Sequence, residues 1–161
     1  MNILEIFVNS IILIITLDKE LWDIIILSLL VSLTALVIAS ILGFMIGYYL
    51  ALYNFFFKQV LLVFLNSLMG IPPVVVGLIV YFLFATGGPL GVFQLLYTPT
   101  AMIIAQTIII FPIVASLSHE IFLKNWIDFK DQIRSLNIPF LGSAKLLFNH
   151  SYFLLITTLL S

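Results

Sequence analysis

Long apolar stretches, separated by short polar segments, dominate this chain. The stretches at residues 24–52, 60–85 and 99–123 are each long enough to cross the roughly 30 Å hydrocarbon core of a bilayer as a helix. An earlier apolar run at residues 3–17 is interrupted by polar side chains and is shorter than the roughly 20 residues that a span requires. The pattern therefore predicts an interfacial helix, a polar boundary anchored by Trp22, and three membrane spans.

Small residues recur at every fourth position of the first predicted span. They are Ala35, Ala39, Gly43, Gly47 and Ala51, and Ser28 and Ser32 extend the same stripe toward the N-terminus. Small side chains let a second helix approach closely. Two interpretations stay open, namely packing within one subunit and a face that lines a dimer interface or a pathway.

Two adjacent prolines interrupt the second predicted span. Pro72 and Pro73 lack backbone donors and clash with the preceding turn, so we expect carbonyl groups one turn earlier to lose their helical partners. Such groups are tolerated in a bilayer only against protein or a water-filled cavity. One interpretation is a simple packing kink. The other is a kinked helix lining a translocation path, with Asn66, Ser67, Gly70 and the two prolines as candidate path residues.

A glycine-rich loop, residues 86–91, precedes the third span. The apolar stretch at residues 92–97 is expected to dip back toward the membrane. Thr98 is placed to cap the following helix, and Pro99 suits its first position. The predicted third span starts there.

Polar side chains also occur within the third span. Thr100, Gln106 and Thr107 have no charged neighbour, and intramembrane polar groups usually face the protein interior. A hydrogen bond between helices and a contact with substrate are both compatible with this pattern. Pro112 predicts a kink further along.

Composition supports a membrane protein. The chain is 63% hydrophobic and 8% charged, whereas soluble domains carry about 25% charged residues. The absence of cysteine excludes disulfides and thiolate metal sites. His119 and His150 lack metal-ligand spacing, and we expect both at helix ends in the interface. No basic patch is large enough to bind nucleic acid.

The basic residues indicate an orientation. With three alternating spans, five of them fall on one side of the membrane: Lys58, Lys124, Lys130, Arg134 and Lys145. The positive-inside rule places that side in the cytoplasm and the loop near residues 87–98 outside.

A helical hairpin of mixed polarity is predicted at residues 126–149. Trp126, Phe129, Ile133 and Leu136 form one apolar helical face. A turn at residues 137–139 is followed by a second helix at residues 140–149, and residues 151–161 begin another apolar helix. The hairpin is either a plain amphipathic pair lying in the interface or a docking surface for a partner.

Residues 131–137 resemble the "EAA" loop of binding-protein-dependent ABC importer permeases. In that loop an acidic residue, two small residues and a glycine six positions after the acid form a helix that couples to a cytoplasmic ATPase. Asp131 stands at the acidic position and Asn137 at the glycine position, while Gln132 and Ile133 replace the small residues. Ser135 completes the residues assigned to coupling.

Three further segments are similar to the tungstate permease family. They are residues 66–77 (NSLMGIPPVVVG), 88–91 (GPLG) and 97–106 (YTPTAMIIAQ), and the resemblance extends over roughly residues 24–148. The related molybdate permease has a different proline segment, so tungstate is favoured. The resemblance implies one all-α domain, a polytopic transmembrane helical bundle of the ABC importer permease (MetI-like) type. It also implies a multi-pass protein of the bacterial or archaeal cytoplasmic membrane.

The resemblance implies partners as well. An external substrate-binding protein delivers an oxyanion, two permease copies form the path within the lipid, and two ATPase subunits dock on the hairpins. The chain lacks the sequence G-x-x-x-x-G-K-[ST], so ATP and Mg²⁺ are expected in the partner. We expect this chain to bind no cofactor or metal and to have no catalytic residues, so it is not an enzyme by itself.

The alternative function is a channel or secondary carrier that works without ATP, since broken helices suit carriers too. Carriers commonly use charged intramembrane residues, and none lies mid-span here. A purely structural membrane scaffold would leave the proline kinks and loop glycines unexplained. Because permeases of this family continue beyond the loop, we expect the chain to be truncated at its C-terminus, as a fragment rather than as a natural truncation.

Overall fold

The computed structural model describes residues 19–136 and 140–160, and every regular element in these ranges is a helix. The helices are α2 (Lys19–Leu52), α3 (Lys58–Met69), α4 (Pro73–Phe84), the short 3₁₀ helix η1 (Gly91–Phe93), α5 (Pro99–Ser135) and α6 (Phe140–Leu160). The predicted all-α class is confirmed. The interfacial helix expected at residues 3–17 lies outside the described residues.

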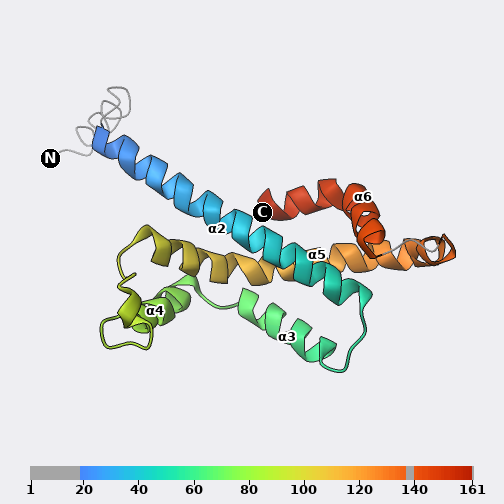
Figure 1. Cartoon of the computed structure of the whole chain (residues 1–161), viewed down its shortest axis with the longest axis horizontal. Helices are drawn as coiled ribbons and strands as arrows, with labels where there is room; N and C mark the ends of the chain where they lie inside the picture. Colours follow the sequence, from blue (N-terminus) through green and yellow to red (C-terminus); the bar gives the residue numbers. More distant parts are fainter. Residues whose placement is uncertain (1–18, 137–139, 161) are drawn as a thin grey trace, which may run out of the picture.

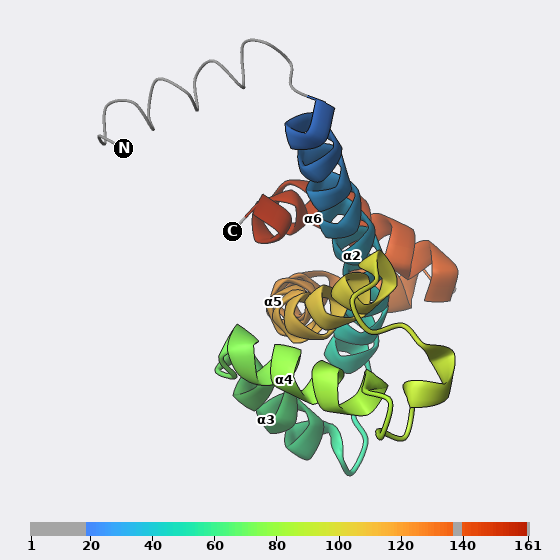
Figure 2. The same cartoon turned by 90° about the vertical axis from the view of Figure 1, so that its left-hand side faces the viewer.

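Two long helices form the frame of the molecule. Lys19–Leu52 and Pro99–Asp131 are the two described helices that are long and apolar enough to cross a membrane. Figure 1 shows α2 crossing α5, and Figure 2 shows α3 and α4 on one side of α5 with α6 on the other. The chain is therefore a membrane protein built on a crossed helix pair, and the first and third predicted spans lie in these two helices.

The stripe of small residues holds α2 against α5. Ala35 and Ala39 are fully buried. A Cβ atom added to Gly43 would lie 2.8 Å from Val114 Cγ1, and one added to Gly47 would lie 2.9 Å from the carbonyl oxygen of Ala115. Such close approach leaves no room for a larger side chain at either position. The residues 35–51 of the stripe therefore pack within the subunit, whereas Ser28 and Ser32 are exposed.

The expected single span at residues 60–85 is wrong in one respect. The structure has two helices of 12 residues each, α3 and α4, bent by 100° at the break between them. A 12-residue helix is about 18 Å long, which is less than the hydrocarbon thickness. The prolines thus break the span rather than kink it.

The backbone explains the break. Pro72 is extended with ψ of 135°, as expected before another proline, and Pro73 begins α4. The N–H groups of Gly70 and Ile71 donate to the carbonyl oxygens of Ser67 and Leu68, each at 3.2 Å. The expected loss of carbonyl partners is therefore wrong for Ser67 and Leu68, because a tightened last turn supplies new donors.

The segment between α4 and α5 folds back on α4. The N–H of Leu90 donates to the carbonyl of Leu83 at 2.9 Å, and a Cβ on Gly88 would lie 2.7 Å from that same oxygen. Leu90, Leu95 and Leu96 pack on a cluster of buried α4 residues, Val76, Val80 and Phe84. α4, the loop residues on either side of η1 and the first part of α5 therefore share one small core.

The predicted start of α5 is confirmed. The hydroxyl of Thr98 accepts a hydrogen bond from the N–H of Ala101 at 3.4 Å, and Pro99 is the first helical residue. The predicted end is wrong. The helix continues through Pro112, past the expected end at residue 123, to Ser135. No proline or glycine interrupts the helix at residues 124–126. The third span and the first hairpin helix are therefore one helix.

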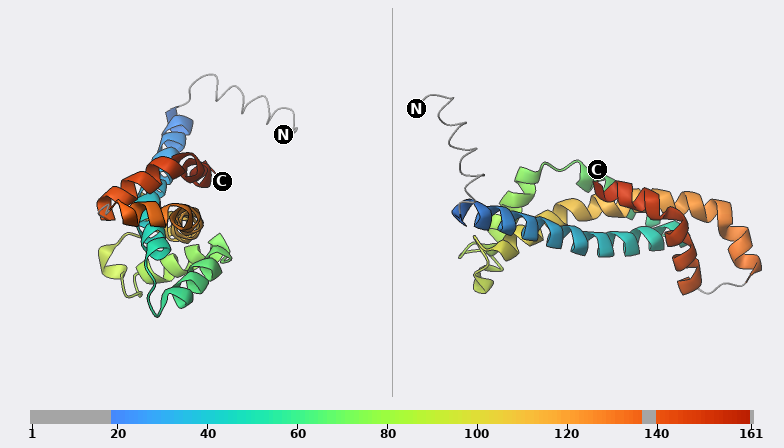
Figure 3. Two further views of the ribbon diagram at one scale, coloured as in Figure 1. Left: turned by 90° about the vertical axis from the view of Figure 1, so that its right-hand side faces the viewer. Right: turned by 90° about the horizontal axis from the view of Figure 1, so that it is seen from above.

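α6 runs back along α5 (Figure 3). Phe148 contacts Phe122 edge-on with ring centroids 4.9 Å apart, and Phe122 contacts Tyr48 of α2 at 5.5 Å. Asn125 donates a hydrogen bond to the hydroxyl of Ser151. α6 is continuous from Phe140 to Leu160, without the break expected after Asn149, but Figures 1 and 3 show that it bends partway along.

Candidate functional site

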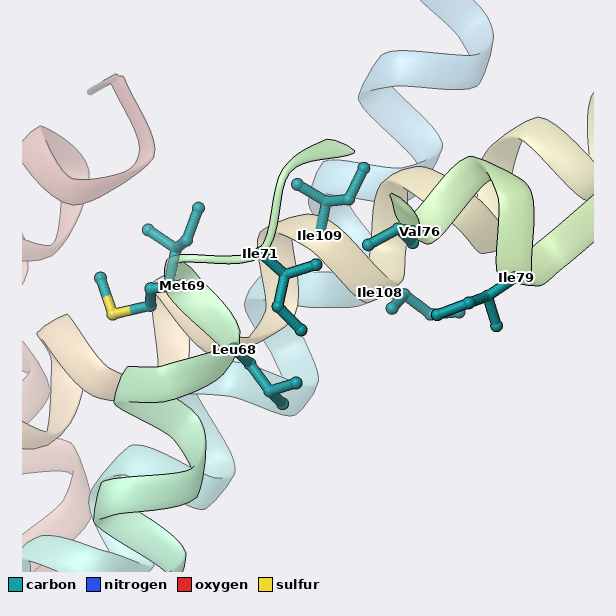
Figure 4. A pocket seen from close by; sticks show the side chains of 8 residues that line it. Leu68, Met69, Ile71, Val76, Ile79, Ile108 and Ile109 are labelled. Carbon is teal, nitrogen blue, oxygen red and sulfur yellow. The ribbon is translucent and has the colours of Figure 1, made fainter. Parts of the chain in front are cut away.

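The break between α3 and α4 borders a cavity of about 120 Å³ against α5 (Figure 4). Its lining is apolar: Leu68, Met69, Ile71, Val76, Ile79, Ile108, Ile109 and Ile113. The residues predicted to line a path are absent from these walls. In this conformation the side chains that surround the break are hydrophobic.

The predicted path residues of α3 and α4 face outward. Asn66, Ser67, Gly70, Pro72 and Pro73 are exposed in the described chain. The hydroxyl of Ser67 donates to the carbonyl of its own helix at Val63, at 2.8 Å. Their assignment to a translocation path stays a prediction. Because they are exposed on this single chain, such a path would need a second surface opposite them.

The path candidates of α5 differ in their surroundings. Thr100 is exposed at the start of the helix, and Thr107 is half-buried with its hydroxyl donating to the carbonyl of Ile103 at 2.7 Å. Gln106 is half-buried, and its Oε1 atom is buried without a hydrogen-bond partner. Within the described ranges no hydrogen bond joins these residues to the candidates on α3. The two sets therefore do not form a single site here.

The predicted coupling residues lie around the end of α5. Asp131 and Ser135 are exposed, whereas Ile133 is 6% exposed and packs in a core cluster with Tyr48 and Ala51 of α2. The side chain of Gln132 and all of Asn137 lie outside the described residues. The end of α5 thus presents polar groups outward and is tied to the frame through Ile133.

The predicted apolar face of this segment is only partly correct. Trp126 and Phe129 pack against the same core cluster as Ile133. Leu136, however, is 71% exposed, because it lies just beyond the last helical residue, Ser135. Sequence periodicity extends the helix one position too far.

Charged side chains surround this region. Lys124, Asp128, Asp131 and Lys145 are exposed, and both signs of charge are present. A second pocket, of about 300 Å³, is lined by Glu120, Ile121, Lys124, Asn125 and Leu154 where α6 passes α5. This end of the molecule therefore offers a polar surface to a partner.

Figure 1 also shows where the ends of the helices meet. The loop from α2 to α3 and the C-terminal end of α5 lie at one end of the bundle, and η1 lies at the other. α3, which begins at Lys58, and α6, which begins at Phe140, therefore both start at this end. This arrangement agrees with the distribution of basic residues, and the side of the membrane stays a prediction.

One buried polar pair was missed from the sequence. His119 is 7% exposed and Ser116 is 4% exposed, and both lie inside α5. The expectation that His119 lies at a helix end is therefore wrong, because α5 continues for four turns beyond it. The spacing of three residues within an apolar helix was a visible signal of a shared face. The side chain of His150 lies outside the described residues.

Comparison with known proteins finds permease relatives. The chain is 42% identical over 109 residues to the tungstate uptake system permease protein TupB of Peptoclostridium acidaminophilum, covering 68% of this chain and 48% of that protein. It is 42% identical over 91 residues to a probable anion ABC transporter permease protein of Haloferax volcanii, covering 56% and 39%. It is 40% identical over 65 residues to TupB of Campylobacter jejuni, covering 40% and 27%.

These matches span about half or less of the relatives' own length. No family model matches the chain, and no solved structure matches it significantly. The similarity is therefore carried by sequence alone.

Proposed function

We propose that this chain, a homologue of the permease proteins of tungstate and anion ABC transporters, is the permease subunit of an importer that moves an oxyanion into the cytoplasm. The homology confirms the resemblance to the tungstate permease family that the sequence predicted. The observation that carries the proposal is the 42% identity over 109 residues to a tungstate uptake permease. Tungstate is accordingly the first candidate substrate.

The fold supports this role. Two membrane-length helices and a broken helix pair give the chain up to three spans, as a multi-pass protein of the cytoplasmic membrane needs. A second copy of the chain would supply the other wall of the path. The exposed candidates Asn66 and Ser67 on α3 would then face that copy.

Energy would come from a partner. The sequence contains no G-x-x-x-x-G-K-[ST] motif, and the relatives are permease proteins, so ATP and Mg²⁺ would bind to a dimer of separate ATPase subunits. The exposed Asp131 and Ser135 at the end of α5 are the candidate contacts for that subunit. Ile133 would transmit movement to α2 because it packs on Tyr48 and Ala51.

The path would bind the anion weakly. No Lys or Arg occurs in the predicted spans, so hydroxyl and amide donors would contact the substrate without trapping it. An external binding protein would provide capture and most of the discrimination between oxyanions. Thr100, Gln106 and Thr107 are the candidate contacts on α5.

A site-specific crosslink tests the ATPase contact. Because residues 1–161 contain no cysteine, Ser135→Cys introduces the one thiol of this segment, at the end of α5. In membranes containing the whole transporter, a bifunctional crosslinker at this thiol should capture an ATP-binding subunit. Tyr97→Cys is the control, because Tyr97 is 83% exposed and lies just before the start of α5, at the other end of that helix from Ser135. Equal capture at both positions, or none at Ser135→Cys in folded complexes, would contradict the proposal.

A further inference from the structure

Three buried side-chain atoms in the described part of the chain have no hydrogen-bond partner: Gln106 Oε1, Ser116 Oγ and His119 Nε2. Ser116 and His119 are both more than nine-tenths buried, and they lie three residues apart on α5. Residues at this spacing are neighbours on one side of a helix. The two unpartnered groups therefore lie near each other on one side of α5, and they are called the pair below.

Neighbouring contacts place His119 where α2, α3 and α5 meet. Ala115, four residues before His119, shares a core cluster with Leu50 of α2 and Leu65 of α3. His119 continues the same face of α5 one turn further on. A Cβ on Gly47 would lie 2.9 Å from the backbone nitrogen of His119, so α2 passes directly over this turn.

Buried polar groups without partners are costly. Each one lowers stability by about 1–3 kcal/mol relative to a satisfied or apolar replacement. A helical serine usually avoids this cost by donating to a carbonyl one turn back, as Ser40 does to Leu36 at 2.6 Å. Ser116 makes no such bond, and its neighbour His119 leaves Nε2 unpaired. An arrangement this costly calls for a function.

The chemistry of the pair suits an oxyanion. A serine hydroxyl and an imidazole N–H both donate hydrogen bonds, and an oxyanion presents only acceptor oxygens. Two charged groups act on the His119 ring, Lys58 at the start of α3 and Glu120 beside it on α5. Lys58 would attract an anion, and Glu120 is exposed, so its charge is screened more strongly.

α3 covers this region only lightly. Leu65 is the one buried residue among the twelve of α3, and the helix ends at the 100° break. Few buried contacts are typical of elements that open locally. Movement of α3 about residues 70–73 would uncover α5 beneath it.

We propose that Ser116 and His119 form an oxyanion-binding station of the translocation path, at the end of the bundle that carries Lys58, and that α3 closes it in this conformation. This inference rests on the proposed importer function. An importer could work without this site, so the contact of the oxyanion with Ser116 and His119 is a separate claim. The anion would meet two fixed donors as α3 opens. It would then leave toward the Lys58 end.

The test uses the complete transporter in proteoliposomes, with its ATPase and binding protein, and tungstate as the probe. Ser116→Ala and His119→Leu each remove one donor. We expect each to lower ATP-driven tungstate uptake about tenfold, the loss expected for a hydrogen bond to a charged group. His119→Gln keeps a donor and should recover part of the uptake.

Thermal stability separates a binding role from a structural one. Because both residues are unsatisfied in the resting state, Ser116→Ala and His119→Leu should unfold at the same or a higher temperature than the natural protein. Ser40→Ala is the matched control, since this buried serine bonds within its own helix, and it should leave uptake unchanged. If uptake and unfolding temperature fall together, or if uptake is unchanged, the station is refuted. If the natural transporter itself moves no tungstate with ATP, the importer function fails instead.

Discussion

The α2–α5 pair and the α3–α4 pair are both membrane helix pairs, yet they are held in opposite ways. α2 and α5 approach so closely that Gly43 and Gly47 have no room for a methyl group, and the hydroxyl of Ser118 donates to the carbonyl of Gly43 at 3.3 Å. α3 buries only Leu65 and borders a cavity. Small residues at contact positions hold α2 tightly against α5, whereas the break at the prolines leaves α3 with few buried contacts.

The largest effect should come from breaking the frame. Gly47→Leu places a side chain against the backbone of Ala115 and His119, which cannot rotate away. Overpacking of this kind costs about 1–3 kcal/mol or more, so we expect little folded protein in the membrane. Folded yield and unfolding temperature in detergent measure this. Gly77→Ala is the control, because a Cβ there meets nothing within 4 Å; an equal loss in both variants would contradict the rigid frame.

A smaller effect is expected where α6 is fixed to the frame. Asn125 is 7% exposed and donates to Ser151, which is fully buried. Asn125→Ala leaves the Ser151 hydroxyl unpaired and should destabilise the protein by about 1–3 kcal/mol. The measurement is thermal unfolding of the purified permease. Asn149→Ala, at an exposed site on α6, should change the unfolding temperature little, and a matching decrease there would refute the assigned role of Asn125.

Removing the prolines should change geometry more than stability. In the double variant with Pro72→Ala and Pro73→Ala, both positions regain N–H donors, so α3 and α4 can join into a straighter helix. We expect a longer distance between spin labels at Phe64 and Leu78, which are exposed on α3 and α4. Pulsed electron paramagnetic resonance measures that distance. Pro89→Ala, in the following loop, should leave it unchanged, and an unchanged distance in the double variant would show that packing rather than proline sets the bend.

The smallest effect should come from filling the cavity. Ile113→Phe adds volume beside a space of about 120 Å³, so it should stabilise the α3–α4 pair by less than about 1 kcal/mol. Slower exchange of the backbone amides of α3, measured by hydrogen–deuterium exchange, would report this. Faster exchange would indicate that the phenylalanine side chain does not fit into the cavity and weakens the packing of α3.

The sequence predicted features that depend on local spacing. The small-residue stripe, the cap at Thr98 and the start of α5 at Pro99 follow from residue type and periodicity alone, and the structure contains all three. The apolar face through Trp126, Phe129 and Ile133 was predictable for the same reason. The homology to permease proteins was likewise visible in contiguous segments.

Features that depend on tertiary contacts were predicted less well. Two prolines signal an interruption, but the bend of 100° depends on the turn at residues 70 and 71 and on packing against α5. The burial of Asn125 depends on its hydrogen-bond partner Ser151 in α6, 26 residues away. The burial of His119 depends on the crossing of α2 at Gly47. Residue spacing can show which side chains share a helix face, but it does not show which other helix that face meets.

The importer function is tested most directly by tungstate uptake into sealed proteoliposomes that contain the complete transporter, with and without ATP. If the chain is the permease of an importer, tungstate should accumulate only with ATP, the binding protein and the ATPase present, and accumulation should be lost when the ATPase is omitted. Tungstate uptake by the permease alone, independent of ATP, would contradict the importer and favour a channel or carrier.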